Sequence, residues 1–272
     1  MPEVASKSAK ANPRRPLAGN TLFFPAATVY AIFVLPASVI SMIGIASGFP
    51  GLASAAGHAH EMLFGFALAV VAGNQLGAMA GKRLAAVGGL WVVSRVTFRL
   101  APQSAAAAAA HLVPRLFGAA KKLRNQALPA VLTAICGSGI AFQIAHYAGY
   151  SSAEYTILMV AVLLFTLLTL FMGGRILAPA AAGQFYRQGR RLDTRVQPRI
   201  ESGLIIAMAV AAVAAAFAGE PQFTRVGAIA MVAAGLLAAA RLLRWRLWSL
   251  RDRPIFFASA QGTDGSRLAC CC

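Results

Sequence analysis

Long runs of apolar residues without any charged side chain constrain this chain more than any other feature of its sequence. Residues Tyr155 to Met172 and Gly203 to Gly219 form two such runs. Apolar stretches of about 18 or more residues are typical of transmembrane helices. Over the whole chain 58% of the residues are hydrophobic and 12% are charged, which is about half the charged fraction of an average soluble domain. The sequence therefore predicts a polytopic membrane protein and excludes a soluble domain, a disordered chain and a collagen-like fibre.

We predict an all-α transmembrane bundle of about eight helices over residues 21–250. A basic segment over residues 1–20 precedes it, and an irregular tail over residues 251–272 follows it. The expected spans are 22–48, 58–81, 84–100, 104–120, 126–149, 154–177, 202–219 and 223–243. The third and fourth are the weakest, because they contain Arg95, Arg99 and His111. A stricter reading of the same pattern gives six spans.

Lysine and arginine are concentrated in every second loop. They occur in the N-terminal segment and after the second, fourth, sixth and eighth spans. The alternate loops, near residues 49–57, 101–103, 147–153 and 219–222, contain neither. Because basic loops stay in the cytoplasm, we expect both termini inside and four loops outside. This topology accounts for the net charge of +17, and we expect no nucleic-acid partner.

The histidines all fall at the outer side of the predicted spans. His58 and His60 lie at the outer mouth of the second span, His111 lies within the fourth, and His146 lies at the outer end of the fifth. Neutral imidazole is a common metal ligand and a common axial ligand of haem. We weigh this role for His58 and His60 against simple capping of a helix at the headgroup level. For His111 we favour a packing role, and for His146 an interfacial one.

The spacing of His58, His60 and Met62 limits how they could bind a metal. His58 and Met62 share one helix face and offer a nitrogen and a soft sulfur, a set that suits copper or haem iron. His58 and His60 point to different sides of a regular helix, so they cannot both bind one ion from within it. Either His58 belongs to the preceding turn, or the two histidines serve different centres.

The second and third predicted spans together contain three charged residues, and charge inside a membrane is costly unless it is paired or faces the bundle interior. Glu61 lies on the second span, and Arg95 and Arg99 lie one turn apart on the third. We expect Arg95 to pair with Glu61 or to bind haem propionates, since its depth disfavours snorkelling. Arg99 is near enough to the outer surface to snorkel there instead.

Small residues recur at a spacing of four along the second span, at Gly65, Ala69, Gly73 and Gly77. Such a stripe lets two helix backbones approach closely. We therefore expect it to face a neighbouring helix rather than lipid.

Three segments of the chain resemble motifs of the NnrS family. The run from His58 to Phe66, His-Ala-His-Glu-Met-Leu-Phe-Gly-Phe, resembles the family's opening motif. Trp91 followed by Arg95 is similar to its next segment, and Gly173-Gly174-Arg175 with Pro179 is similar to a later element. The resemblance covers roughly residues 20–253. The family has a further histidine motif beyond the end of this chain, so the tail ending in three cysteines is expected to be a truncated or frameshifted end.

The resemblance implies a multi-pass protein of the bacterial inner membrane that contains haem and copper. It also implies a role in resistance to nitric oxide stress, with nitric oxide as a small ligand and His58 and His60 at the metal or haem site. The alternative function is a cofactor-free transporter or channel in which Glu61 and Arg95 line a path through the lipid bilayer. Catalytic turnover cannot be inferred from these residues.

Overall fold

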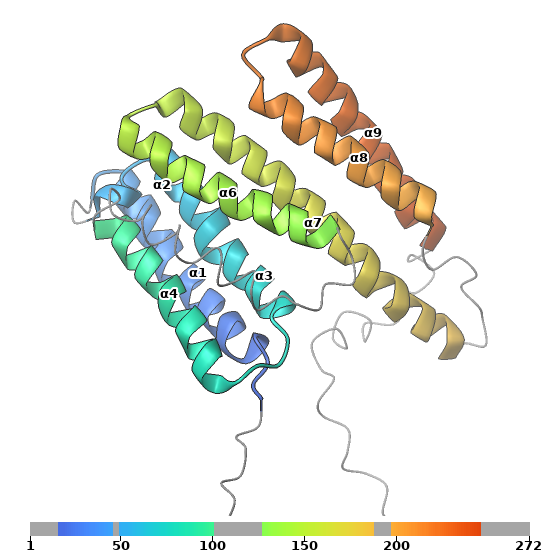
Figure 1. Ribbon diagram of the computed structural model, residues 1–272, viewed down its shortest axis with the longest axis horizontal. Helices are drawn as coiled ribbons and strands as arrows, with labels where there is room; N and C mark the ends of the chain where they lie inside the picture. Colours follow the sequence, from blue (N-terminus) through green and yellow to red (C-terminus); the bar gives the residue numbers. More distant parts are fainter. Residues whose placement is uncertain (1–15, 46–48, 101–126, 188–196, 246–272) are drawn as a thin grey trace, which may run out of the picture. The chain divides into compact units, whose positions relative to one another are not determined.

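The structure, a computed structural model, describes residues 16–45, 49–100, 127–187 and 197–245. Within these ranges the chain is helical apart from connecting turns and one isolated bridge between Leu17 and Met79 (Figure 1). The all-α prediction is confirmed. The chain divides into two compact units, one formed by residues 1–129 and 136–158 and the other by residues 130–135 and 159–272.

The first unit holds the helices that carry the predicted site. They are α1 (Asn20–Met42), the short turn η1 (Pro50–Leu52), α2 (Ala55–His60), the π-helical stretch η2 (Glu61–Ala67), α3 (Leu68–Gln75), α4 (Gly81–Leu100), most of α6 (Ala127–Ala148) and the first residues of α7 (Ser151–Arg187). The second unit holds the remainder of α7 with α8 (Pro198–Ala216) and α9 (Pro221–Trp245).

Helices occur at seven of the eight predicted spans, and the remaining span, over residues 104–120, lies outside the described residues. Among the described residues, six helical segments are long and apolar enough to cross a membrane. They are α1, the continuous segment Ala55–Gln75, α6, α7, α8 and α9. Helix α4, which carries Arg95 and Arg99, is not one of these six. The total of eight spans therefore stays a prediction.

The small-residue stripe packs α3 and η2 closely against α1. A Cβ atom on Gly73 would lie 2.6 Å from the Phe24 ring, and one on Gly65 would overlap the Tyr30 ring. Ala69, between them, is fully buried. The expectation of close packing is confirmed for these positions and is wrong for Gly77, because no described neighbour lies within 4 Å of its Cβ position.

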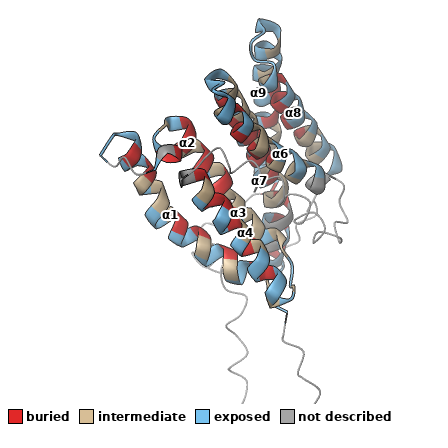
Figure 2. Cartoon of the chain, turned by 60° about the vertical axis from the view of Figure 1, so that its left-hand side comes forward, coloured by how far each residue is buried: buried red, intermediate tan, exposed pale blue. Residues whose placement is uncertain are grey.

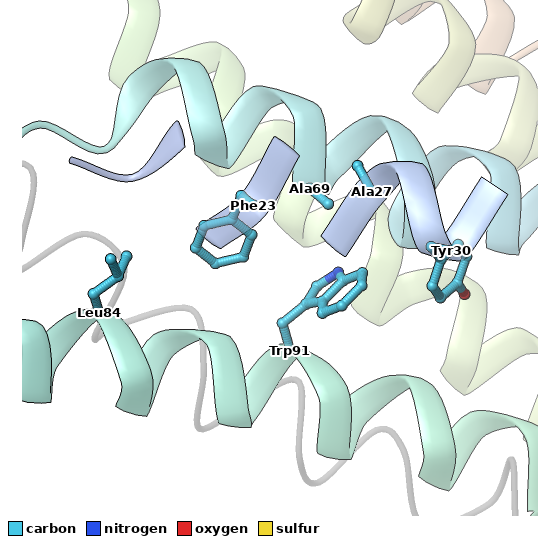
Figure 3. Close-up of a cluster of buried hydrophobic side chains, with 6 residues drawn as sticks. All are labelled: Phe23, Ala27, Tyr30, Ala69, Leu84 and Trp91. Atoms are coloured by element: carbon cyan, nitrogen blue, oxygen red, sulfur yellow. The ribbon is translucent and has the colours of Figure 1, made fainter. Parts of the chain in front are cut away.

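A buried cluster joins α1, α3 and α4 (Figure 3). Trp91 of α4 is at its centre: its ring lies 6.3 Å from the Phe23 ring and 5.3 Å from the Tyr30 ring, between centroids. The Trp91 indole N–H also donates a hydrogen bond to the Gly65 carbonyl at 3.3 Å. Because aromatic pairs and a satisfied indole fix side-chain orientation, this cluster sets the register of the three segments.

Exposed residues alternate with buried ones along the helices (Figure 2), and many of the exposed side chains are large and apolar. Phe33 on α1 and Leu236 on α9 are each 67% exposed, and Ile32 and Ile229 beside them are also exposed. Large exposed apolar surfaces on long helices are solvated well by lipid and poorly by water. Together with the six long apolar segments, these faces identify a multi-pass membrane protein.

An ion pair fastens the three helices of the second unit. Arg241 of α9 donates two hydrogen bonds to the Glu201 carboxylate of α8, at 3.1 and 3.2 Å. Both side chains pass over Gly174 of α7, whose Cβ position lies 3.1 Å from Arg241 Nη1. The Arg241 guanidinium also lies 5.1 Å from the centroid of the Trp245 ring. Gly174 thus provides the space in which this pair forms.

Candidate functional site

The segment that carries the predicted histidines begins with a tight, capped turn. Ser54 caps α2, since its hydroxyl accepts a hydrogen bond from the Gly57 N–H at 3.0 Å. Gly57 itself lies against the Gly51 carbonyl, where a side chain would clash. This turn sets where α2 starts. His58 therefore lies within helix α2, and of the two alternatives the one that places it in the preceding turn does not hold.

His58 is half-buried, and its ring is oriented by α1. Its Nδ1 lies 2.5 Å from the Ser38 hydroxyl oxygen. The Ser38 hydroxyl donates its single proton to the Leu35 carbonyl at 2.6 Å, so it can only accept from His58. Nδ1 of His58 therefore carries the ring proton, and Nε2 carries the lone pair that a metal requires.

His60 points to a different side of the segment and is completely buried. The rings of Phe98, Phe142 and Phe64 surround it, at centroid distances of 4.1, 4.6 and 5.0 Å. Within the part of the chain that the structure describes, neither ring nitrogen has a hydrogen-bond partner. Nδ1 lies 3.4 Å from Glu61 Oε1. The two histidines thus serve different surroundings, as the helical spacing predicts.

Glu61 is fully buried and is held from two other helices. The guanidinium of Arg95 on α4 donates to Glu61 Oε1 at 3.1 Å, and the Tyr30 hydroxyl on α1 donates to Oε2. Arg95 also donates to the Ser94 hydroxyl at 3.1 Å. Of the two roles expected for Arg95, the structure shows the pairing with Glu61. The sequence analysis did not identify Tyr30 as part of this cluster. The one feature that could have indicated it is its hydroxyl group within an apolar predicted span.

The π-helical stretch η2 begins at Glu61 and runs to Ala67. Such stretches are rare and are often found at functional sites. Here the widened turns follow the histidine pair directly and contain Gly65, the first residue of the stripe that packs on α1. The stretch therefore influences how Glu61 is presented to Tyr30 and Arg95.

His146, for which the sequence favours an interfacial role, also belongs to the aromatic cluster around His60. Its Nδ1 lies 3.0 Å from Glu154 Oε1 at the start of α7. Its ring stacks on Phe142 at a centroid distance of 5.9 Å and an angle of 10°, and Phe142 also stacks on His60. Its side chain retains 25% exposure. His146 is thus the partly exposed end of the aromatic cluster.

For the remaining predicted residues, no contact with this cluster is seen in the part of the chain that the structure describes. Met62 is 41% exposed on η2. Arg99 lies on α4 and Arg175 on α7, but their side chains fall outside the described part, and His111 lies outside the described residues altogether. Among the described residues, no group of three histidine, cysteine or acidic side chains is placed to hold a metal ion.

The fold and site define a class: a multi-pass helical membrane protein with a buried histidine, carboxylate and arginine cluster within its first unit. Comparison with family models gives a match to the NnrS protein family over residues 18–260. The chain belongs to the NnrS family, as its motifs indicate. The same comparisons find no match to a curated protein or to a solved structure.

Proposed function

We propose that this protein binds transition-metal centres, copper and haem iron, in a bacterial inner membrane and acts in resistance to nitric oxide stress. The observation that carries the proposal is the hydrogen bond between His58 and Ser38. A metal-ligating histidine donates its second ring N–H to a neighbouring oxygen, which fixes the tautomer and the ring orientation. Because Ser38 donates to the Leu35 carbonyl, its oxygen accepts the Nδ1–H of His58. Nε2 of His58 is then available to bind a metal.

The donor set around His58 suits such a centre. His58 is half-buried at the end of the helices that loop charge predicts to be outer, so its ring is reachable without opening the core. Met62, one helical turn further along, is exposed and adds a soft sulfur donor suited to copper. A copper ion or a haem iron held there supplies a coordination position for nitric oxide. A complete ligand set requires donors beyond these two, since the described residues hold no three-residue cluster.

His60 fits a metal differently. Its Nε2 is buried and unpaired within the described residues, and a buried nitrogen left without a partner costs about 1–3 kcal/mol. A metal ion at Nε2 would satisfy it. The close packing of Phe98 and Phe142 on the ring does not fit a porphyrin at this position. We therefore assign haem iron or copper to His58 and a second, enclosed metal position to His60.

Arg95 supports the site indirectly. Its contact with Glu61 already compensates its charge inside the membrane. In our proposal Arg95 therefore holds the Glu61 carboxylate and does not bind propionates.

Metal analysis of the purified protein tests the proposal. Copper per protein and the haem absorption band are measured for wild type, His58→Ala and His60→Ala, with the lipid-facing Phe33→Ala as control. We expect His58→Ala to lose the accessible centre, His60→Ala to lose the enclosed one, and Phe33→Ala to match wild type. Wild-type contents of both metals in both histidine variants would overturn the ligand assignment.

The alternative, a cofactor-free transporter or channel, draws on the Glu61–Arg95 pair. It expects a colourless wild-type protein without copper. The same preparation therefore distinguishes the two functions.

A further inference from the structure

We propose that Tyr30 and Glu61 form a positioning relay that sets the tautomer of His60, keeping the proton on Nδ1 and the lone pair on Nε2. The proposal extends the proposed function, because it concerns how His60 is prepared as a ligand. It assigns Tyr30 and Glu61 as positioning residues, since neither has to touch the metal.

The Tyr30 ring is fixed in place before it contacts the site. It is nearly fully buried and packs on Trp91 at a centroid distance of 5.3 Å and an angle of 51°. The hydroxyl end of the ring also fills the space left by the missing side chain of Gly65. These two contacts hold the ring, and its hydroxyl donates to Glu61 Oε2.

The Glu61 carboxylate is fixed at both oxygens. Tyr30 of α1 donates to Oε2, and Arg95 of α4 donates to Oε1 at 3.1 Å. Because the donors come from two different helices, the carboxylate cannot rotate without breaking one of these contacts. Hydrogen bonds to a charged acceptor are about twice as strong as those between neutral groups. Oε1 is consequently held on the side of His60.

The electrostatic consequence falls on the two nitrogens of His60. The ion-pair contact of the ring with the Glu61 carboxylate is made through Nδ1, which lies 3.4 Å from Oε1. Burial among phenylalanine rings favours a neutral imidazole, which carries one proton. Charge interactions act strongly in such low-dielectric surroundings. The nearby negative oxygen therefore favours the proton on Nδ1 and leaves Nε2 as the electron-pair donor.

A purely structural role for the same residues is the competing explanation. In that case Tyr30, Glu61 and Arg95 only join α1, η2 and α4, and the His60 tautomer is indifferent to them. The two explanations differ in what happens when a hydroxyl or a charge is removed without changing shape. Tyr30→Phe keeps the ring packed on Trp91, and Glu61→Gln keeps the side-chain volume.

The experiment is ¹⁵N solid-state NMR of metal-free, histidine-labelled protein in lipid bilayers. The His60 signals are assigned by their loss in His60→Gln. In wild type we expect Nδ1 protonated and Nε2 unprotonated. Glu61→Gln should move the population to the Nε2-protonated form, and Tyr30→Phe should give a mixture of the two. Ser41→Ala, which removes another buried hydroxyl from α1, should leave the wild-type spectrum.

Two results would overturn the relay: a wild-type His60 protonated at Nε2, or a wild-type spectrum in both Glu61→Gln and Tyr30→Phe. If Glu61→Gln does not accumulate in membranes, Tyr30→Phe alone decides, and an unchanged spectrum counts against the relay. The metal content of His60→Ala tests the proposed function separately. A His60→Ala protein that keeps its metals removes the ligand role, while the tautomer measurement still decides whether Tyr30 and Glu61 act on His60.

Discussion

Arg95 and Glu61 form an ion pair at 3.1 Å between α4 and the π-helical start of η2, with the carboxylate fully buried. The pair joins two segments of a membrane protein at a depth where neither charge could remain alone. Tyr30 brings a third helix to the same carboxylate. In our proposal, the stability of the first unit and the tautomer of His60 therefore depend on the same cluster of Tyr30, Glu61 and Arg95.

The ion pair makes a prediction about stability. Removing one partner of a buried pair leaves an uncompensated charge and costs about 3–5 kcal/mol, whereas replacing both with neutral groups costs much less. We expect Arg95→Met to lower the free energy of unfolding by about 3–5 kcal/mol. Adding Glu61→Gln to that variant should restore most of the loss. Unfolding by SDS in bicelles measures both; equal losses in the single and the double variant would mean that the charges are not coupled.

Helix packing gives a prediction with a control glycine two residues beyond the end of α3. The Cβ position of Gly73 lies 2.6 Å from the Phe24 ring, while that of Gly77 has no described neighbour within 4 Å. Gly73→Leu should therefore separate α1 from α3 and cost about 1–3 kcal/mol from overpacking. Folded yield in membranes is the measurement, and Gly77→Leu is the control. Equal yields of the two variants would show that the stripe does not face α1.

The second unit offers two adjacent glycines that differ in their surroundings. At Gly174 a side chain meets Arg241 and Glu201, whereas at Gly173 its nearest neighbour is Leu177 at 4.0 Å. We expect Gly174→Val to displace the Arg241–Glu201 pair and lower the melting temperature, and Gly173→Val to have a much smaller effect. Melting of the purified protein distinguishes them. A melting temperature that falls as far in Gly173→Val would assign the effect to helix propensity instead.

These contacts show what the sequence could and could not predict. The pairing of Arg95 with Glu61 was accessible, because charges within lipid need partners and both lie at similar depth. The participation of Tyr30 was not, because it depends on the rotation of α1 against η2, which one hydroxyl in an apolar run does not specify. The Gly77 error has a related origin: α3 ends at Gln75, so Gly77 lies beyond the helix whose face the spacing of four assumes.

The position of His146 illustrates a further limit. Its place at the C-terminal end of α6 was evident from the chain, and Phe142 lies one turn before it on the same helix. The approach of its ring to Phe98 of α4, at a centroid distance of 6.1 Å, depends on how α6 packs against α4. Its partner Glu154 lies beyond the turn at Gly149, which adopts a φ of 75°. A single sequence shows neither the turn geometry nor the packing.

Membrane topology is testable at two exposed positions. Tyr150 lies in the turn between α6 and α7, and Arg83 lies near the start of α4. Loop charge predicts that Tyr150 is outside and Arg83 inside. In a background without the native cysteines, Tyr150→Cys should react with an impermeant maleimide in intact cells. Arg83→Cys should react only after the membrane is opened. Labelling of both in intact cells would contradict the alternating topology.

The last prediction concerns Ser38, which orients His58. Ser38 accepts from His58 Nδ1 and donates to the Leu35 carbonyl. In Ser38→Ala the imidazole loses the contact that fixes both its tautomer and its rotation. Loss of such an outer-shell partner typically lowers metal affinity about 10–100-fold. We expect this reduction in copper affinity, measured by competition with a chromogenic copper chelator.

Ser41→Ala is the matched control for that measurement. Ser41 is also a buried serine on α1, and its hydroxyl has no hydrogen-bond partner among the described residues. Its loss should leave copper affinity within the error of the titration. If Ser38→Ala and Ser41→Ala both bind copper as wild type does, His58 does not depend on Ser38. The hydrogen bond that carries the proposed function would then be a packing contact between α1 and α2.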